Sequence, residues 1–396
     1  MRIGMILDNV FPPDPRVENE AIELIRGGNE VFLFCLTYSE SEAEKTVEIN
    51  GISVVRYLSN QLEYKLSALA YTVPFYTWSM QKKIKHFIKK YTIQALHIHD
   101  IKIAQATFNA NKNFDLPVVL DLHDNYPEVM KFYPHLQTFP GKYIISPKKW
   151  KQKEEAFIHL ADKVITVSKE FVNDLLHRIT MDKDKVVLVP NTIRSSFFTD
   201  YTVDEEIVKR YQGKFMLLYL GDTHLRRGLL TAIRSLQYLT APIPAIKLVI
   251  VGKSTTDTVL KREVATLGLE EYVDFEGWKD VALFQSYIEA SSLCISPLRR
   301  NLQHDVAYAN KLFQYMSLGK PLLVSDAIAQ RDLVERISSG LVHQEKNPED
   351  FAEKVLQLYT NKDLQIELGN NGRSFVRNEF TWDKTAKGLI ALYKDL

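Results

Sequence analysis

Apolar segments with the length of strands alternate with amphipathic helical segments along the whole chain. Strand-like segments occupy residues 2–7 and 31–36, and the helical pattern between them, 17–28, ends at two glycines where a C-terminal cap is expected. Because the strand-like segments are apolar on both faces, they predict a parallel sheet covered by helices on two sides. Four more strand-like segments and one more helical segment follow, at 95–100, 117–124, 163–168, 185–190 and 150–161.

The same alternation starts again after a polar stretch at 190–206, where a strand-like segment ends in Pro-Asn. We therefore predict two doubly wound, Rossmann-like α/β domains, 1–195 and 207–380, that face each other across a cleft. Ligands of such sheets bind beyond the carboxyl ends of the strands, so the residues that follow each strand are the candidates for chemistry. The second set of segments is 214–221, 227–239, 246–252, 261–269, 273–277, 292–298, 310–319 and 321–326.

The composition of the chain excludes several classes of protein. A chain of 396 residues with 45% hydrophobic and 25% charged residues is neither disordered nor fibrous. No apolar segment approaches the ~18 residues that a transmembrane helix needs, and the N-terminal one is too short for a signal peptide. Cys35 and Cys294 lie in apolar segments, which predicts buried, reduced thiols and a cytoplasmic protein.

The net charge of +1 averages two regions of opposite sign. Residues 1–50 carry 4 Lys and Arg against 10 Asp and Glu, whereas residues 51–153 carry 15 against 6. Within the basic region, 65–90 and 142–153 combine lysines with aromatic residues, a pattern that binds anionic lipid at about 1 kcal/mol per basic residue. The alternative is a solvated helix face. We expect a peripheral association with the inner face of the cell membrane, and no nucleic-acid motif accompanies the basic residues.

The loop 221–228 joins a predicted strand to a predicted helix and carries Arg226 and Arg227. Free N–H groups at a helix N-terminus beside guanidinium groups form an anion site. Two solvated arginines in a surface turn are the alternative. The chain lacks the GxxxxGK[ST] motif, and GxGxxG follows none of the predicted strands, so the pattern disfavours a P-loop and NAD binding.

A second candidate anion site is the start of the predicted helix 310–319. Asn310 is the expected N-cap, and Lys311 falls in the first turn. A lysine there opposes the helix dipole at a cost of a few tenths of a kcal/mol, roughly, which an anionic ligand would offset. A capped amphipathic helix without a ligand is the alternative.

Histidines at strand ends are the third candidate. His123 ends the segment 117–124 and could hydrogen-bond a substrate, although a partly buried structural histidine has the same pattern. His97, His99 and Asp100 suggest a metal site, but no third ligand follows at a recognisable spacing. We therefore predict no metal and no cofactor.

The order of the motifs resembles one enzyme family. Taken together they are similar to the family-4 retaining glycosyltransferases, also called glycosyl transferases group 1, which have two Rossmann-like domains in the GT-B arrangement. The resemblance runs essentially from end to end. The motifs that carry it are DPRVENEAIELIRGGNEVFLF, LHDNYPE, ITVSKEF, VPNTI, YLGDTHLRRGLLTAI, IVGK, YVDFEGW, ANKLFQYMSLGKPLLVSD and FTWDKTAKGLIALY.

The resemblance implies a role for each site. In the family a nucleotide-diphosphate sugar, UDP- or GDP-linked, binds the C-terminal domain, and the final helix, 381–396 here, packs back on the N-terminal domain. Asp222 stands where many members have a second arginine, which Lys253, Arg299 or Arg300 could replace. The catalytic candidates are His123, Arg227 and Lys311. The donor-binding candidates are Gly221, Asp222, Arg227, Lys253, Phe275, Tyr308, Ala309, Asn310, Lys311, Leu312 and Gln314. The acceptor-side candidates are Asp14 and Arg16, which follow the first strand and are expected to face the cleft, and Asp124.

One departure from the family pattern raises an alternative function. Many members carry two glutamates seven residues apart, the second of which binds the ribose; here these positions hold Val306, next to Asp305, and Gln314. The resemblance implies metal-independent transfer of a sugar, with retention of configuration, to a glycan or lipid-linked acceptor in cell-surface polysaccharide synthesis. The alternatives are a non-catalytic glycosyltransferase-like partner subunit and a UDP-sugar 2-epimerase.

Overall fold

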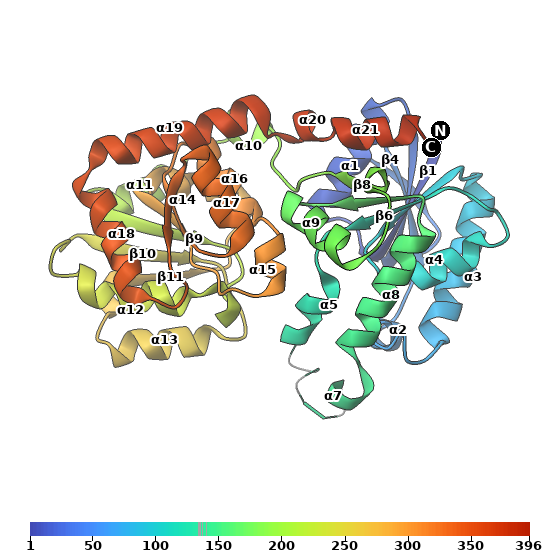
Figure 1. Cartoon of the computed structure of the whole chain (residues 1–396), viewed down its shortest axis with the longest axis horizontal. Coiled ribbons are helices and arrows are strands. Elements are labelled where there is room, and N and C mark those ends of the chain that lie inside the picture. The colour runs from blue at the N-terminus through green and yellow to red at the C-terminus, as the bar shows by residue number, and fades with distance from the viewer. Residues whose placement is uncertain (134–135, 137, 140) are drawn as a thin grey trace. The chain divides into compact units, whose positions relative to one another are not determined.

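The chain contains two compact units, drawn in Figure 1. Unit 1 combines Met1–Pro190 with Thr385–Leu396, and unit 2 is Asn191–Lys384. Each unit has a sheet of mainly parallel strands joined by helices, which confirms the predicted class of two doubly wound α/β domains. The computed structural model describes residues 1–133, 136, 138–139 and 141–396.

The sheet of unit 1 has eight strands in the order β3-β4-β2-β1-β5-β6-β7-β8. Every neighbouring pair is parallel except β3 and β4. The central strands are buried along most of their length, as expected for strands covered on both faces. The strands are Arg2–Val10 (β1), Glu30–Thr37 (β2), Thr46–Ile49 (β3), Ile52–Leu58 (β4), Ala95–His99 (β5), Val118–Leu122 (β6), Lys163–Thr166 (β7) and Val186–Leu188 (β8).

The antiparallel pair β3–β4 differs from the wholly parallel sheet that the apolar pattern predicts. Asn50 and Gly51, between the two strands, both have positive φ, 51° and 80°. That is the conformation of a type I′ turn, for which Asn-Gly is the strongest sequence signal. The signal stands in the sequence as TVEINGISVV, but its strands are short and polar on one side, so a search for buried strands passes over it.

The helices of unit 1 include the last one of the chain. Figure 1 shows α21 beside α1, and α21 also contacts β8, so the C-terminal segment completes the N-terminal unit. The helices of this unit are Pro15–Arg26 (α1), Gln61–Ser67 (α2), Phe75–Tyr91 (α3), Ala104–Asn111 (α4), Tyr126–Val129 (α5), Gly141–Ile144 (α7), Pro147–Leu160 (α8), Lys169–Arg178 (α9) and Lys387–Lys394 (α21).

The sheet of unit 2 has six parallel strands in the order β11-β10-β9-β12-β13-β14. Apolar residues pack on both of its faces, Leu217 and Leu248 in one cluster and Leu218 and Val249 in the other. Its strands are Phe215–Leu220 (β9), Ile246–Val251 (β10), Val273–Gly277 (β11), Leu293–Ser296 (β12), Leu322–Ser325 (β13) and Gly340–His343 (β14). Its helices are Ser196–Thr199 (α10), Glu205–Tyr211 (α11), Leu229–Leu239 (α12), Asp257–Thr266 (α13), Phe284–Ala290 (α14), Leu302–Val306 (α15), Asn310–Ser317 (α16), Ile328–Ile337 (α17), Pro348–Thr360 (α18) and Lys362–Glu379 (α19), with Trp382–Thr385 (α20) at its end.

Three further features follow from the fold. The chain enters unit 2 after Pro190, so residues 191–195, which we assigned to the N-terminal domain, belong to unit 2 by their contacts. Cys35 and Cys294 are free, buried thiols, as predicted, and burial raises the pKa of each to about 12. Within the described residues, no helix is both long enough and apolar enough to span a bilayer.

Candidate functional site

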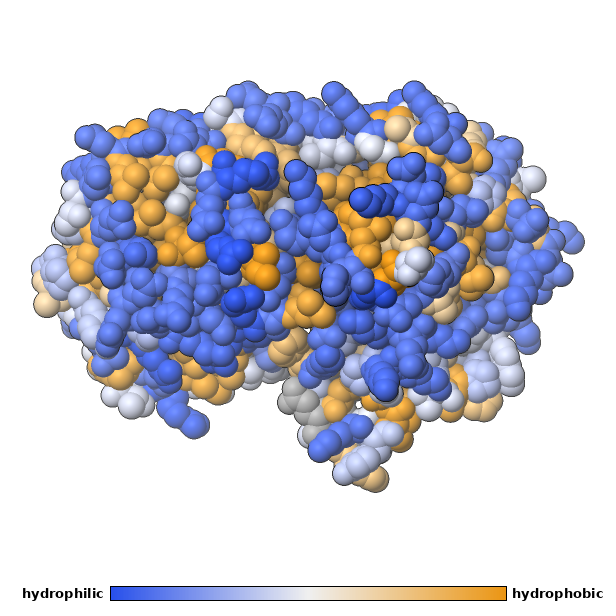
Figure 2. Space-filling view, in the orientation of Figure 1, coloured by the Kyte–Doolittle hydropathy of each residue, from blue (hydrophilic) through white to orange (hydrophobic). Residues whose placement is uncertain are grey.

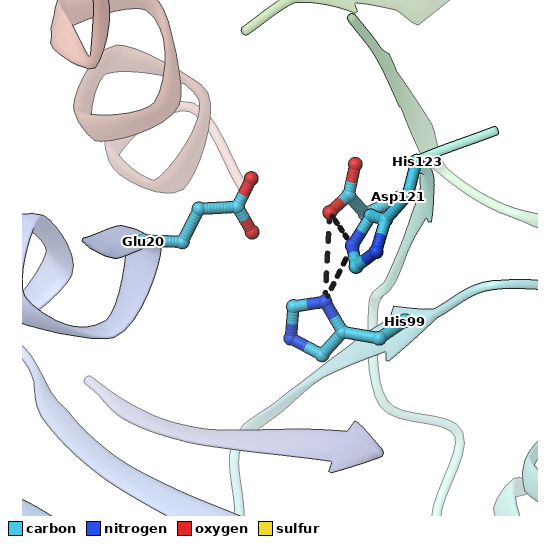
Figure 3. Close-up of side chains that lie close together, drawn as sticks. All are labelled: Glu20, His99, Asp121 and His123. Atoms are coloured by element: carbon cyan, nitrogen blue, oxygen red, sulfur yellow. Dashed lines mark hydrogen bonds and ion pairs between the residues drawn. The ribbon is translucent and has the colours of Figure 1, made fainter. Parts of the chain in front are cut away.

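The carboxyl ends of β5 and β6 bring three polar side chains together in unit 1. His99 ends β5, Asp121 lies near the end of β6, and His123 follows β6. The Nε2 atom of His123 lies 2.6 Å from Asp121 Oδ2 and 3.0 Å from Nδ1 of His99. Figure 3 shows the two rings turned toward the carboxylate, with Glu20 of α1 facing them. The strand-end rule therefore located this group correctly.

Arg16 does not face an open cleft as we expected. It is 5% exposed and donates to both Asp121 oxygens, at 2.8 and 3.1 Å. It also pairs with Glu20 at 2.8 Å and donates to the Val189 carbonyl at 3.2 Å. The reason is the position of α1: Asp14 caps the helix by accepting from the Val17 N–H, so the next turn packs over the end of β6.

His97 extends the buried cluster to the end of the chain. Its Nε2 atom lies 3.3 Å from Glu20 Oε2, and its Nδ1 atom is 2.8 Å from the hydroxyl of Tyr393 on α21. Sequence reasoning did not associate Tyr393 with His97, because 296 residues separate them. The strand-end group is thus held by both ends of the chain.

The pKa values of this cluster show which groups carry charge. Burial alone would lower the pKa of His123, but the carboxylates of Asp121 and Asp100 outweigh it and raise that pKa to about 10. Burial would raise the pKa of Asp121, but Arg16 and His123 hold it well below its usual range. Burial and the neighbouring His97 lower the pKa of His99 well below its usual value. The cluster therefore contains charged Arg16, charged His123 and ionised Asp121, which compensate one another.

By distance, part of this cluster could hold a metal ion. Ligand atoms of Glu20, His99, Asp121 and His123 lie within 4.8 Å of one another. The sequence shows no third ligand at a recognisable spacing, but α1 and β6 bring Glu20 and Asp121 beside the histidines in space. The Arg16 guanidinium already forms ion pairs with Glu20 and Asp121 in this place. The absence of a metal from the activity therefore stays a prediction.

The acceptor-side candidates lie at different places. Asp14 and His123 both line a cavity of about 890 Å³ in unit 1. Asp124 is exposed and is not among the residues that line this cavity. Asp100, which also lines it, has its pKa raised to about 6, chiefly by burial.

In unit 2 the loop after β9 approaches its neighbours so closely that side chains are excluded. Gly221 and Gly252 both have positive φ, 112° and 146°, and a Cβ atom on Gly252 would lie 1.9 Å from the Gly221 carbonyl. A Cβ on Gly228 would lie 1.7 Å from the Pro297 carbonyl. These contacts hold the loop against the ends of β10 and β12.

Two arginines and one carboxylate occupy this loop. Asp222 Oδ2 lies 3.2 Å from Arg227 Nε and 3.5 Å from Arg226 Nη2. Both arginines belong to a short 3₁₀ turn before α12. Burial would raise the pKa of Asp222, but the His224 N–H and Arg227 lower it. Asp222, in the place of the second family arginine, thus serves as a counterion for Arg227 rather than as a phosphate contact.

Lys311 carries the most unusual environment in unit 2. Its Nζ atom is buried 3.5 Å from the centroid of the Tyr219 ring and has no hydrogen-bond partner among the described residues. A Cβ on Gly221 would lie 3.4 Å from this Nζ, so the ammonium lies against the loop. Burial, and then the charge of Arg227, lower the pKa of Lys311 well below its usual value. The site has more cationic groups than Asp222 alone neutralises.

His304 also belongs to this group, and the sequence did not indicate it. Burial lowers its pKa to about 3, and the charges of Arg227, Arg226 and Lys311 add to that effect. Its Nδ1 atom donates to the Arg299 carbonyl at 2.7 Å. It lies on the five-residue helix α15, whose sequence has no pattern that marks a site.

Helix α16 begins differently from the prediction. Its N-cap is Ala309, without a side-chain cap, and Asn310 is the first helical residue with its Oδ1 atom buried and unpartnered. The reason is that the backbone of Ala309 is still extended, at φ −86° and ψ 128°. The helix start therefore leaves its N–H groups without the expected side-chain oxygen.

The remaining donor-binding candidates are not all at the loop. Leu312 is fully buried in the core, whereas Tyr308, Ala309 and Gln314 are partly exposed around α16. Phe275 packs against the core on the edge strand β11, under Lys261. Lys253 is exposed after β10.

Of the three groups that could replace the missing family arginine, the Arg300 side chain has another partner. Arg300 pairs with Asp305, and Asp305 also accepts from the Ile328 N–H at the start of α17. The N–H of Arg299 donates to the Arg226 carbonyl. Asp305 therefore caps a helix, and it does not take the place of the family glutamate.

Two family comparisons cover most of the chain. Residues 200–375 match the family described as Glycosyl transferases group 1, and residues 16–197 match Glycosyltransferase Family 4. An uncharacterized glycosyltransferase of Methanocaldococcus jannaschii is 23% identical over 384 residues, which are 94% of this chain and 91% of that protein. The GDP-mannose-dependent alpha-(1-6)-phosphatidylinositol monomannoside mannosyltransferase of Mycobacterium tuberculosis is 23% identical over 206 residues, 51% of this chain and 54% of its own.

Solved structures share the fold. Sucrose-phosphate synthase from Thermosynechococcus elongatus aligns with a TM-score of 0.81 at 17% identity and covers 100% of this chain and 98% of its own. Anabaena HepE, solved in complex with UDP-glucose, aligns with a TM-score of 0.73 at 14% identity and covers 100% of both chains. Together, the two adjoining family matches and the two doubly wound units show that the chain belongs to the group 1, family-4 glycosyltransferases of the GT-B type.

Proposed function

We propose that this protein transfers a sugar from a nucleotide-diphosphate sugar to a lipid-linked or glycan acceptor with retention of configuration and without a metal ion. The observation that carries the donor half of the proposal is the buried, unpartnered Nζ of Lys311. An ammonium without a counterion is costly in a protein interior, and a diphosphate beside it would remove that cost.

The cations of unit 2 are suited to the departure of a nucleoside diphosphate. As the anomeric C–O bond breaks, negative charge develops on the phosphate oxygens. Arg227 and Lys311, with the N–H groups at the start of α16 that no side chain caps, are held in place before the reaction and would stabilise that charge. Positive charge from the protein supports the proposal that a metal ion is unnecessary.

We do not propose the carboxylate of Asp222 as a nucleophile. Asp222 is paired with Arg226 and Arg227. We propose instead that the leaving phosphate accepts the proton of the acceptor hydroxyl while the new bond forms on the same face of the sugar. This is the course that the family resemblance implies.

UDP and GDP are the proposed nucleotides. Anabaena HepE was solved with UDP-glucose, and the mycobacterial relative is named as GDP-mannose-dependent. Gln314 lies where many members have the ribose-binding glutamate. Its amide can hydrogen-bond a ribose diol, but without the charge that strengthens such a bond, so we expect weaker nucleotide binding than in glutamate-containing members.

The acceptor half of the proposal rests on the surface of unit 1. Phe75 and Trp78 at the start of α3 are 60% and 55% exposed, and Tyr143 on α7 is 78% exposed. Figure 2 shows hydrophobic and hydrophilic residues interleaved on the lower projection, where Figure 1 places α7. Lys142, Lys148 and Lys149 are exposed close by in the sequence. A surface of aromatic and basic residues suits an anionic membrane and a lipid-linked acceptor in polysaccharide synthesis at the cell surface.

A thermal-shift screen with UDP, GDP, ADP and their sugars tests the donor half. One nucleotide should stabilise the protein by about 2.7 kcal/mol at 100 times its Kd. Arg227→Ala should abolish that shift, whereas Arg262→Ala, an exposed arginine on α13, should leave it unchanged. Failure of every nucleotide to stabilise the folded protein would contradict the proposal and favour a non-catalytic partner subunit.

Product analysis without an acceptor then separates transfer from epimerisation. A transferase should release free nucleoside diphosphate slowly by hydrolysis of the donor. Conversion of the donor into an epimeric nucleotide sugar, with no nucleoside diphosphate released, would instead identify a 2-epimerase.

A further inference from the structure

The cavity of unit 1 lies beyond the carboxyl ends of β1, β5 and β6. Its volume, about 890 Å³, is that of a site for a small organic ligand. One end is polar: Asp8 of β1 and Lys102 form an ion pair of 2.8 Å there, and Asp100 and His123 lie at the ends of the next two strands. This end belongs to the strand-end cluster already described.

The rest of the cavity is mainly apolar, although Lys65, Ser67 and Thr138 also line it. Leu69 follows α2, Met130 follows α5, Ile145 precedes α8, and Trp150 lies in the first turns of α8. Trp150 is held by the Tyr71 ring, whose centroid lies 4.5 Å away. Leu69, Met130 and Ile145 offer no hydrogen-bond partners, so burying an unpartnered hydroxyl against them would cost about 1–3 kcal/mol. These walls fit an apolar ligand body.

The mouth of the cavity is continuous with exposed hydrophobic residues. Tyr64, Phe139 and Ile144 line the cavity and are nevertheless 60%, 84% and 43% exposed. The hydroxyl of Thr72, before α3, donates to the Ile144 carbonyl, which joins the α2–α3 segment to α7. A long apolar ligand could therefore extend from the cavity onto the surface that we propose to contact the membrane.

Asp100 is held in an unusual conformation at the polar end. Its φ of 63° lies in the left-handed region, which aspartate adopts more readily than most residues other than glycine and asparagine. Its Oδ1 atom accepts the His123 N–H at 3.3 Å, and its Oδ2 atom lies 3.7 Å from His123 Nδ1. The side chain is still 29% exposed, so the carboxylate can accept a hydrogen bond from a ligand.

We propose that this cavity binds the acceptor, that the acceptor is an alcohol with an apolar body, and that Asp100 accepts the hydrogen bond of its hydroxyl in the bound complex, before that hydroxyl gives its proton to the leaving phosphate. The inference rests on the proposed function, whose acceptor it specifies. The walls select the apolar body, while Asp100 orients the hydroxyl beside His123.

A homologous series of 1-alkanols, from 1-butanol to 1-octanol, tests the apolar walls by calorimetry on the full chain. Affinity should rise about fourfold with each added methylene. Maltose, as a polar probe, should not bind or compete. Affinity that does not depend on chain length, or competition by maltose, would overturn the inference.

Filling the cavity provides the matched test. Ala68 lines the cavity, whereas Ala156 is exposed on α8 of the same unit. Ala68→Phe should reduce the affinity for 1-octanol at least tenfold, and Ala156→Phe should not change it. Equal affinities in the two variants would place alkanol binding elsewhere and overturn the inference.

Asp100→Asn tests the hydroxyl contact with a residue that tolerates positive φ. It should weaken 1-octanol binding about tenfold and leave the fourfold gain per methylene intact. Asp115→Asn is the control, because Asp115 also has positive φ, 53°, but is exposed and lies outside the cavity. Equal effects of the two substitutions would remove Asp100 from the site.

The nucleotide shift separates this inference from the proposed function. Ala68→Phe and Asp100→Asn should both keep the wild-type nucleotide shift, because the cations that we propose to bind the nucleotide belong to unit 2. A protein that binds a nucleotide but discriminates neither alkanol length nor Asp100→Asn overturns the acceptor inference alone. A protein that no nucleotide stabilises overturns the proposed function, whatever the alkanols do.

Discussion

The two units treat buried charge in opposite ways. In unit 1, Arg16, Glu20, Asp121 and His123 form a cluster in which every charge has a partner of opposite sign nearby. In unit 2, Lys311 is buried beside a tyrosine ring, and its Nζ has no hydrogen-bond partner among the described residues. The charged groups of the first cluster are paired with one another, whereas burial and Arg227 lower the pKa of the Lys311 amine well below its usual value.

This difference identifies two kinds of role. Removing one member of a buried ion pair strongly destabilises a protein, so we expect the unit 1 cluster to contribute to stability. A buried amine without a partner costs stability in the unliganded protein, and an anion bound beside it would offset that cost. Both units bury ionisable groups, so burial alone does not distinguish the two roles. The number of oppositely charged partners around each group does.

The largest effect should come from Arg16→Met. This substitution leaves Asp121 and Glu20 buried without their guanidinium, and the free energy of unfolding should fall by about 3–5 kcal/mol. Urea denaturation followed by circular dichroism measures it. Arg26→Met is the control, because Arg26 pairs with Glu23 but is 58% exposed, and its loss should cost at most about 1 kcal/mol. Equal losses would show that the cluster of unit 1 is not a compensated network.

Lys311→Met should have the opposite effect on the unliganded protein. It removes a buried, unpartnered nitrogen, so the free energy of unfolding should rise by about 1–3 kcal/mol. The stabilisation by nucleotide, about 2.7 kcal/mol at 100 times the wild-type Kd, should disappear. Differential scanning fluorimetry with and without nucleotide measures both changes. Lys209→Met, on the exposed face of α11, should alter neither. A variant that loses stability but keeps the nucleotide shift would place the anion elsewhere.

The smallest expected effect is the uptake of a proton by Lys311 when the nucleotide binds. Burial and Arg227 lower the pKa of Lys311 in the free protein, and a bound diphosphate should raise it again, so binding should take up one proton between the two pKa values. Because the bound state holds the extra proton, affinity should fall as pH rises through this interval, by at most about tenfold per pH unit. Calorimetry in buffers of different ionisation enthalpy counts the proton. Lys311→Met should abolish this uptake, and its persistence would assign it to another group.

The fold could be predicted largely from local pattern. Alternating apolar strands and amphipathic helices indicated two doubly wound units, because burial on both faces leaves a continuous apolar signature in each strand. The hairpin β3–β4 escaped this search, since its signal is the turn pair Asn50–Gly51 rather than apolar strands.

For the candidate sites, the sequence predicted the position along the chain and in the sheet, but not the contacts of the side chains. The strand-end rule led to His123 and to the loop at Arg227, which lie at the carboxyl ends of parallel strands; their roles stay predictions. It could not place Arg16, which we expected at an open surface, nor Asn310, which begins α16 instead of capping it. Both errors concern which neighbours a side chain meets, and that depends on how α1 and α16 pack.

By itself, then, the sequence determined the fold class, the family and the strand ends where polar groups gather, because periodicity and motif order are properties of neighbouring residues. Only the tertiary structure decided that Tyr393 meets His97, that Arg16 neutralises Asp121, and that Lys311 lies buried against Tyr219. These contacts join residues far apart in the chain. The energies of these contacts depend on distance and burial, and the pattern of neighbouring residues in the sequence gives neither quantity.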